Sequence, residues 1–286
     1  MQIKKIEDCR RVYRDIVAGY SVIKKPFCYL KHLREIDLGA LENKNDTILE
    51  ELKAQGIPSE KEVLIALDSR GIWEKKDEEN YWQSISSIKD LQAEQRKIVS
   101  REQVEDLLKI INQRKEEVRK ISEERDSHLR ISAEYFVRKK SQEEIIKISF
   151  FKDEELKQPL FNQDEFDNLD FKDLAIYFSI FNEFCDTVNE LNIKKIATTP
   201  FFLNSLSLAG DDAQKFYGRP IVELSLYQCD LFNHGKLNRT ILEQGDSSPP
   251  ENYDDLDKIV LFFDANYSIL LGKIEQNKRD SKHNQR

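Results

Sequence analysis

Apolar residues recur at intervals of three and four along most of the chain, which predicts amphipathic helices. Gly19 is a natural end for the first helix. Ser59 and Glu62 have the spacing of a capping box, in which each side chain bonds the backbone N–H of the other residue. The helices expected in this first part cover Ile6–Ala18, Arg34–Asn43, Asp46–Gln55 and Ser59–Arg70.

Two short β-prone runs, Tyr20–Ile23 and Phe27–His32, flank a turn at Pro26. They predict a β-hairpin. An isolated hairpin is marginally stable in water, so a helix or a strand of another chain is expected beside it. We expect the strand near Phe27–Lys31 to offer its edge to a partner.

Residues 74–129 contain neither glycine nor proline and are dense in charges of both signs. A second capping box, Ser100 to Gln103, divides this stretch into two helices. Two amphipathic helices joined by a short connection most economically fold back as an antiparallel coiled-coil hairpin, although each helix could instead pair with another subunit. The apolar stripe expected on the first helix comprises Trp82, Ile85, Ile88, Leu91, Ile98 and Val99. The a/d positions expected on the second are Val104, Leu107, Ile111, Arg114, Val118, Ile121, Arg125 and His128.

The C-terminal half alternates aromatic anchors with helices. Phe150, Phe151 and the phenylalanines that follow lie in an acidic, loop-like stretch. Asp170–Leu191 is strongly amphipathic, and Pro200 is expected to break or start a helix. A last helix is expected over Tyr253–Lys273, followed by a disordered polar tail.

Composition supports a mainly α fold: 9 glycines and 7 prolines in 286 residues leave few tight turns. We expect a helical bundle with a projecting antiparallel coiled-coil hairpin and one small N-terminal β-hairpin. The expected domains are an N-terminal helical subdomain (1–73), the charged coiled-coil hairpin (74–130), an acidic C-terminal helical domain (131–273) and the tail (274–286).

Charge is unevenly distributed. Residues 1–36 carry nine Lys or Arg against four acids, a balance of +5, whereas residues 150–270 carry ten bases against twenty-two acids, a balance of −12. An acidic body repels phosphates, so nucleic acid is a disfavoured partner. The basic start is best interpreted as a solvated helix face or as a partner for the acidic half.

No catalytic pattern is visible. The four cysteines, Cys9, Cys28, Cys185 and Cys229, are isolated, which is typical of small buried hydrophobes in a reducing compartment. The histidines lack metal-ligand spacing, and Cys229 and His234 would lie on different faces of one helix. We therefore expect neither an enzyme nor a cofactor or metal site.

The expected location is the cytoplasm. The opening residues are too charged for a signal-peptide core, and the longest apolar run, Ile259–Gly272, is interrupted by Asp264 and Asn266. No membrane contact is expected.

Two stretches resemble assembly proteins of T4-like tailed bacteriophages, namely tail assembly chaperones and baseplate-hub assembly proteins. The first is Lys24–Asp37. The second is Ile196–Leu203, which leads to Phe216–Pro220 and the helix Leu224–Phe232. The chain lacks the cysteine knuckle often found in that class. The resemblance implies a helical, non-catalytic component of virion assembly, located in the host cytoplasm or in the virion, with other tail or baseplate subunits as partners.

Together these patterns predict a structural or assembly protein that binds protein partners, with homo-oligomerisation through the coiled coil as one form of contact. The alternative is a regulatory or nucleic-acid-associated module that uses the basic N-terminal segment. The expected contact residues lie in the hairpin, on the coiled coil and in the Tyr217-Gly-Arg-Pro220 turn. They are Phe27, Tyr29, Lys31, Arg114, Arg125, His128, Tyr217 and Arg219.

Overall fold

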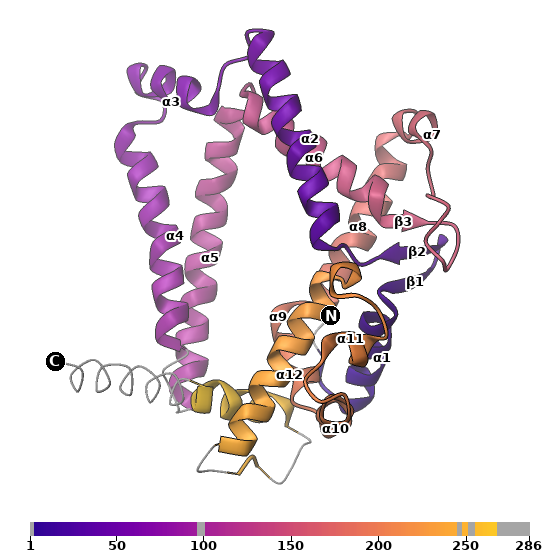
Figure 1. The fold of residues 1–286 in the computed structure, drawn as a ribbon. Helices are drawn as coiled ribbons and strands as arrows, with labels where there is room; N and C mark the ends of the chain where they lie inside the picture. The colour runs from indigo at the N-terminus through magenta and orange to yellow at the C-terminus, as the bar shows by residue number, and fades with distance from the viewer. Residues whose placement is uncertain (1–2, 96–100, 245–247, 251–254, 268–286) are drawn as a thin grey trace, which may run out of the picture. The chain divides into compact units, whose positions relative to one another are not determined.

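The computed structural model describes residues 3–95, 101–244, 248–250 and 255–267, and these residues are mainly helical with a small antiparallel sheet (Figure 1). The mainly α class with an N-terminal β-hairpin is confirmed. The chain divides into two compact units. Unit 1 comprises Met1–Gly39 and Glu144–Arg286, and unit 2 comprises Ala40–Glu143. The first residues of the chain thus fold with the C-terminal half, a grouping that the expected division at residues 73 and 130 did not contain.

Unit 1 begins with α1 (Ile6–Ala18), which buries Cys9, Val12 and Ile16 on one face. Gly19 ends the helix in the left-handed region, with φ 81°, and its N–H donates to the last carbonyls of α1. This conformation favours glycine because it has no Cβ. The predicted helix and its stop are confirmed.

The sheet has the order β1–β2–β3, with β1 at Tyr20–Lys24, β2 at Phe27–Lys31 and β3 at Phe150–Phe151. All neighbours are antiparallel, and Val22 lies opposite Tyr29. The predicted hairpin is confirmed. The loop predicted at residues 150–151 is wrong, because this pair supplies the third strand that a hairpin needs for stability.

Short helices follow in unit 1: α7 (Gln163–Asp167), α8 (Phe171–Thr187), α9 (Glu190–Ala197), α10 (Pro200–Leu208), α11 (Ala213–Tyr217), the 3₁₀ turn η1 (Ile221–Glu223), α12 (Leu226–Gln244) and a helix over 256–267. The single helix expected over Asp170–Leu191 is wrong. The Asn189 side chain accepts from the Asn192 N–H and starts α9 as a separate helix. Pro200 starts α10, as one of its two expected roles.

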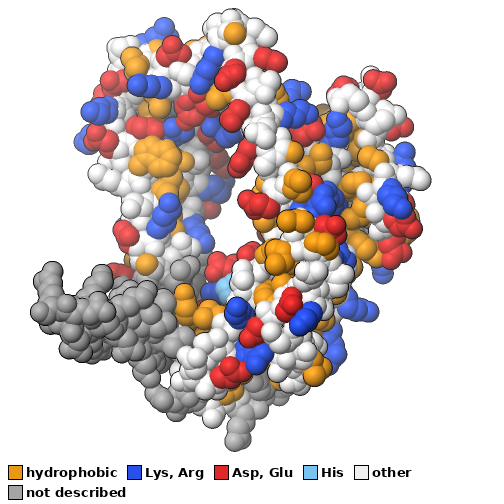
Figure 2. Space-filling view, viewed as in Figure 1, with side chains coloured by type: hydrophobic (Ala, Val, Ile, Leu, Met, Phe, Trp, Pro, Cys, Tyr) orange, Lys and Arg blue, Asp and Glu red, His pale blue; other side chains and the backbone are white. Residues whose placement is uncertain are grey.

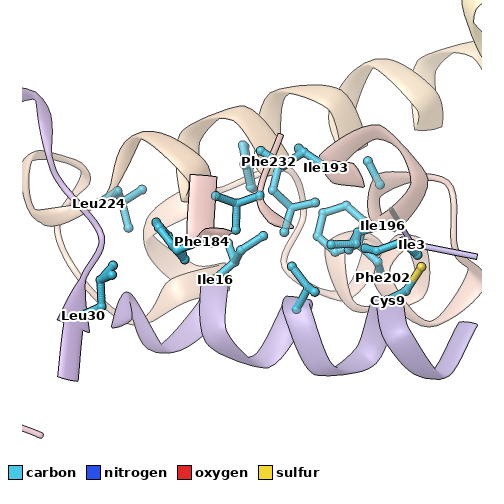
Figure 3. Close-up of a cluster of buried hydrophobic side chains, with 14 of the residues drawn as sticks. Ile3, Cys9, Ile16, Leu30, Phe184, Ile193, Ile196, Phe202, Leu224 and Phe232 are labelled. Atoms are coloured by element: carbon cyan, nitrogen blue, oxygen red, sulfur yellow. The ribbon is translucent and has the colours of Figure 1, made fainter. Parts of the chain in front are cut away.

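Side chains from α1, β2, α8, α9, α10 and α12 meet in the main core of unit 1 (Figure 3), and Ile241, Ile259 and Phe263 form a separate smaller cluster between α12 and the helix over 256–267. Ile16, Leu30 and Phe202 are among its fully buried members. Helix α12 crosses α10 at Gly235, where an added Cβ would lie 2.3 Å from Cε1 of Phe202. Glycine at this position therefore permits the close approach of the two helices.

Unit 2 is built from most of α2 (Glu35–Ala54), α3 (Glu60–Ser69), α4 (Lys75–Gln95), α5 (Arg101–Leu129) and most of α6 (Ala133–Ser149). The two helices expected between residues 34 and 55 are one continuous helix. Asn45, which lies between the two expected helices, donates from its side chain to Ser141 on α6. The capping box of Ser59 and Glu62 is confirmed.

Helices α4 and α5 pack antiparallel, since the start of α4 contacts the end of α5 (Figure 1). Ile88 and Ile111 are buried in the seam, as expected. Trp82 was expected there but is 55% exposed. The guanidinium of Arg125 lies 5.2 Å from the Tyr81 ring and 5.9 Å from the Trp82 ring, so both rings cover this cation instead of filling the seam. Ile98, Val99 and the Ser100 capping box lie outside the described residues.

Candidate interaction surface on the sheet

The sheet of unit 1 has one face in the core and one face turned away from it. Burial alternates along β1 and β2, as strand geometry requires. Ile23, Cys28 and Leu30 contact the core together with Val12 and Ile16 of α1. The opposite side, here called the outer face, is formed by Tyr20, Val22, Lys24, Phe27, Tyr29 and Lys31.

Aromatic rings cover the outer face. Tyr29 lies between Tyr20 and Phe27, and each pair of ring centroids is 5.6 Å apart with edge-to-face geometry. Phe27 is 65% exposed and Val22, opposite Tyr29, is 48% exposed. Large apolar side chains at this exposure are typical of surfaces that contact another molecule when several of them are adjacent.

Two hydrogen-bonded acids border these rings. The Tyr20 hydroxyl donates to Glu154, and this bond, with partial burial, raises the pKa of Tyr20 to about 12. Lys31 donates to Asp37 at 2.8 Å, and Asp37 also accepts from the guanidinium and backbone of Arg34. Partial burial alone would raise the pKa of Asp37, but these bonds outweigh burial and lower it to about 2. The aromatic surface therefore has a fixed polar rim.

One edge of the sheet is open. The His32 N–H donates to the Gly19 carbonyl at 2.9 Å, so these two residues form a hydrogen-bonded pair next to the β1–β2 ladder. Hydrogen-bonded and non-hydrogen-bonded pairs alternate along an antiparallel ladder. The backbone groups of Tyr20, Val22 and Lys24 then point away from β2. In the strand order β1–β2–β3, β1 is an outer strand, with β2 as its paired strand and the preceding helix α1 packed against it.

The opposite edge of the sheet is covered by the chain itself. Phe151 pairs with Pro159, the Leu160 N–H donates to the Phe150 carbonyl at 2.8 Å, and the Lys152 N–H donates to the Gln158 carbonyl. The expectation that β2 offers its edge is wrong, because β2 is the central strand. The edge that an incoming strand could use is that of β1.

Phe27, Tyr29 and Lys31 were expected as contact residues, and β2 brings all three to the outer face. The sequence reasoning missed Tyr20 and Val22, which complete this face from β1. Tyr20 and Val22 alternate with Ser21 and Ile23 at the period of a strand, and this pattern could have predicted that they share one face. Glu154 could not have been found in this way, since it is 134 residues from Tyr20.

Arg125 and His128, expected on a contact surface of the coiled coil, are engaged within unit 2. The Arg125 side chain is 9% exposed and makes two bonds to Glu78, at 2.8 and 2.9 Å, and one contact with Glu60 at 2.5 Å. Glu78 also accepts from the indole N–H of Trp73, and Trp73 lies beside His128. This cluster joins α3, α4 and α5.

Arg114 is exposed on α5, but its guanidinium bonds Glu117 one turn away at 2.9 Å. Arg119 bonds Glu116 and Glu123 in the same manner. Acidic and basic side chains are interspersed over the visible surface of unit 2 (Figure 2). Such intrahelical pairs are typical of a solvated helix face.

Tyr217 and Arg219 lie at the corner between α11 and α12. Tyr217 is buried and its hydroxyl donates to the Gln228 carbonyl at 2.9 Å, and burial raises its pKa. Arg219 is half-buried, with Nη1 next to the backbone of Gly19. Gln228 in turn donates to the Val17 carbonyl, so this corner holds α12 against the end of α1.

Burial favours the neutral forms of several reactive side chains. Burial raises the pKa of the thiols of Cys9 and Cys28 to about 11 and also raises the pKa of Cys229. Burial lowers the pKa of His234. Within the described ranges, no three His, Cys, Asp or Glu side chains are grouped to hold a metal ion.

Within the described part of the chain, no helix combines the length and the apolar character that a membrane span requires. Comparison of the chain with protein-family models, with curated proteins and with solved structures finds no match. The function is therefore argued from the chemistry of the outer face and of the β1 edge.

Proposed function

We propose that this chain is a non-catalytic structural or assembly protein that binds a protein partner through the outer face of its sheet. The observation that carries the proposal is the adjacency of Tyr20, Val22, Phe27 and Tyr29 on this face, next to an unpaired strand edge. Exposed aromatic and aliphatic side chains favour contact with a protein surface, since their burial releases water from apolar area. Morphogenesis of a phage tail or baseplate is the setting that the sequence resemblance suggests.

The distribution of charge favours a protein over nucleic acid. Lys31 and Arg34 of the basic N-terminal segment both bond Asp37, Arg11 lies 3.8 Å from Asp8, and the Arg10 guanidinium stacks on the Phe201 ring. Cations that are already paired contribute less to phosphate binding, which depends on the release of counterions. In the described part of the coiled-coil hairpin, α4 packs on α5, and Ile88 and Ile111 are buried between them.

The test is photo-crosslinking in native lysate with benzoylphenylalanine at position 27. The matched control carries the same residue at position 171, because Phe171 is also an exposed phenylalanine of unit 1, on α8. We expect a discrete crosslinked protein from position 27 that is absent from position 171. Crosslinks to nucleic acid alone, or equal protein patterns from both positions, would contradict the proposal.

A further inference from the structure

The edge of β1 has unused hydrogen-bonding capacity at the centre of the candidate surface. Tyr20, Val22 and Lys24 direct their N–H and C=O groups away from β2, and no other described strand approaches them. Unpaired groups in this row are a template for another strand. Their side chains belong to the outer face, so an incoming strand would extend that face as well as the ladder.

The cations at this end of the hairpin indicate the charge of the occupant. Lys24 and Lys25 are exposed, and neither forms an ion pair with any described residue. Exposed lysine on an edge strand opposes pairing with strands that lack a complementary charge. An acidic residue opposite Lys24 would form a cross-strand ion pair, and an apolar residue opposite Val22 would continue the apolar surface.

A second copy of the chain fits this edge less well. Two β1 strands paired about Val22 would place Lys24 opposite Tyr20 of the other copy, so the residue directly opposite the lysine would not be an acid. Backbone hydrogen bonds to β1 do not distinguish a second copy of the chain from a segment of another protein. The charge of the residue opposite Lys24 distinguishes them.

From these observations we propose that an extended acidic segment of a protein partner adds to β1 as a fourth strand of the sheet. The segment alternates residues so that an acid lies opposite Lys24 and an apolar side chain lies opposite Val22. This inference rests on the proposed function, because it specifies how the partner enters the same surface.

The first test separates the edge from the outer face. Val22→Pro removes an N–H that points away from β2, and edge strands accept proline at such positions. Val22→Thr changes the side chain but keeps this N–H. Both are made in the chain that carries benzoylphenylalanine at position 27, on β2. We expect Val22→Pro to reduce the crosslinked protein at least about ten-fold more than Val22→Thr does, because both variants lose the valine side chain but only the proline variant also loses a hydrogen bond to the partner.

The outcomes distinguish the two proposals. Equal yields of the crosslinked protein from the two variants overturn strand addition and leave the outer face as the contact. Absence of the crosslink even in the chain with Val22 overturns the proposed function itself. Slow amide exchange at Ser21 and Ile23, whose N–H groups bond β2, verifies that Val22→Pro preserves the hairpin.

The second test addresses charge with a defined probe. The full chain is titrated with the capped peptide Thr-Glu-Thr-Val-Thr-Tyr-Thr and with its counterpart that has Lys in place of Glu, and the Val22 amide is followed by NMR. We expect saturable shifts of this amide, with roughly 1.5- to 5-fold tighter binding of the acidic peptide at low salt. Equal affinities, no saturable shift up to millimolar peptide, or a shift of the Val22 amide that depends on protein concentration alone would overturn the acidic-strand proposal.

Discussion

The sheet of unit 1 and the helical hairpin of unit 2 both expose an aromatic side chain, but the two rings have different surroundings. Trp82 on α4 is 55% exposed, and its indole N–H donates to Glu78 next to the Arg125 guanidinium. Phe27 on β2 is 65% exposed and lies on a face with three further aromatic or aliphatic side chains and an unpaired edge. Exposure alone therefore does not mark a contact surface. The two regions differ in whether hydrogen-bonding groups near the exposed ring are already paired, as at Trp82, or point away from their own sheet, as on the β1 edge near Phe27.

The two units also differ in what stabilises them. Unit 1 has a continuous apolar core, whereas unit 2 relies at one end on a cation held between two carboxylates. A loss of apolar volume should damage the first most, and a loss of charge should damage the second.

The largest effect is expected from Phe202→Ala in the core of unit 1. Phe202 is fully buried and its ring contacts α12 at Gly235. Removal of a buried phenylalanine costs about 3–5 kcal/mol, because transfer free energy is lost and a cavity remains. Urea denaturation followed by circular dichroism measures this change. A loss below about 1 kcal/mol would show that this part of the core is not as tightly packed as described.

A smaller loss is expected from Arg125→Ala. It leaves Glu78 without a cation and Glu60 with Arg138 alone, and both acids are mostly buried, which costs about 2–4 kcal/mol. Proteolysis should then cleave unit 2 before unit 1.

Arg114→Ala is the matched control on the same helix. Its partner Glu117 is exposed, so we expect a change in stability of less than about 0.5 kcal/mol. Equal destabilisation by both substitutions would contradict the assignment of Arg125 to the interior of unit 2.

Acid should weaken unit 1 through His32. This side chain is 1% exposed, contacts the Phe184 ring, and has its pKa lowered to about 3 because burial disfavours the charged form. The unfolded chain binds a proton near pH 6.5 and the folded chain does not, so the stability that depends on neutral His32 is complete above pH 6.5. It decreases as the pH falls from about 6.5 towards 3.

The measurement is the urea midpoint between pH 7 and 5, compared with His32→Gln. Asp37, whose pKa is lowered to about 2, has little influence on how the urea midpoint changes between pH 7 and 5. A pH dependence that is identical in the two proteins would contradict the assignment to His32.

A small effect on stability is expected from Phe27→Ala. Phe27 is 65% exposed, and its edge-to-face contact with Tyr29 on the same strand is worth about 0.5–1.5 kcal/mol. Binding of the partner should nevertheless fall strongly. Stability, and recovery of the same partner protein in a pull-down of the tagged chain, are measured side by side on Phe27→Ala and Phe171→Ala to check this separation. Equal losses of capture in both variants would remove the distinction between the outer face and other exposed phenylalanines.

Sequence reasoning could find the elements whose signals are local. The Ile6–Ala18 helix, its stop at Gly19, the capping box at Ser59 and the hairpin around Pro26 each depend on residues within a few positions of one another. The antiparallel pairing of α4 and α5 was one of two expectations for amphipathic helices joined by a short connection, the other being pairing with another subunit.

Contacts between distant residues could not be predicted. β3 is two residues long, too short for an alternation to be recognised, and it pairs with a strand 120 positions earlier. Arg125 fell on the expected seam, but its acid partner Glu60 lies on α3, outside any heptad pattern. For this reason Arg125 was interpreted as a partner contact and not as an interior cation.

The most direct test of the account is hydrogen exchange at the backbone of β1. The chain is labelled with ¹⁵N-valine and ¹⁵N-isoleucine, and Val22→Thr assigns the Val22 signal. In the free chain we expect the Val22 amide to exchange much faster than the Ile23 amide, which bonds β2. In the complex isolated through the position 27 crosslink, we expect Val22 to become at least about ten-fold slower, because its N–H then bonds the partner strand. Protection of Val22 in the free chain, or unchanged exchange in the complex, would contradict the account.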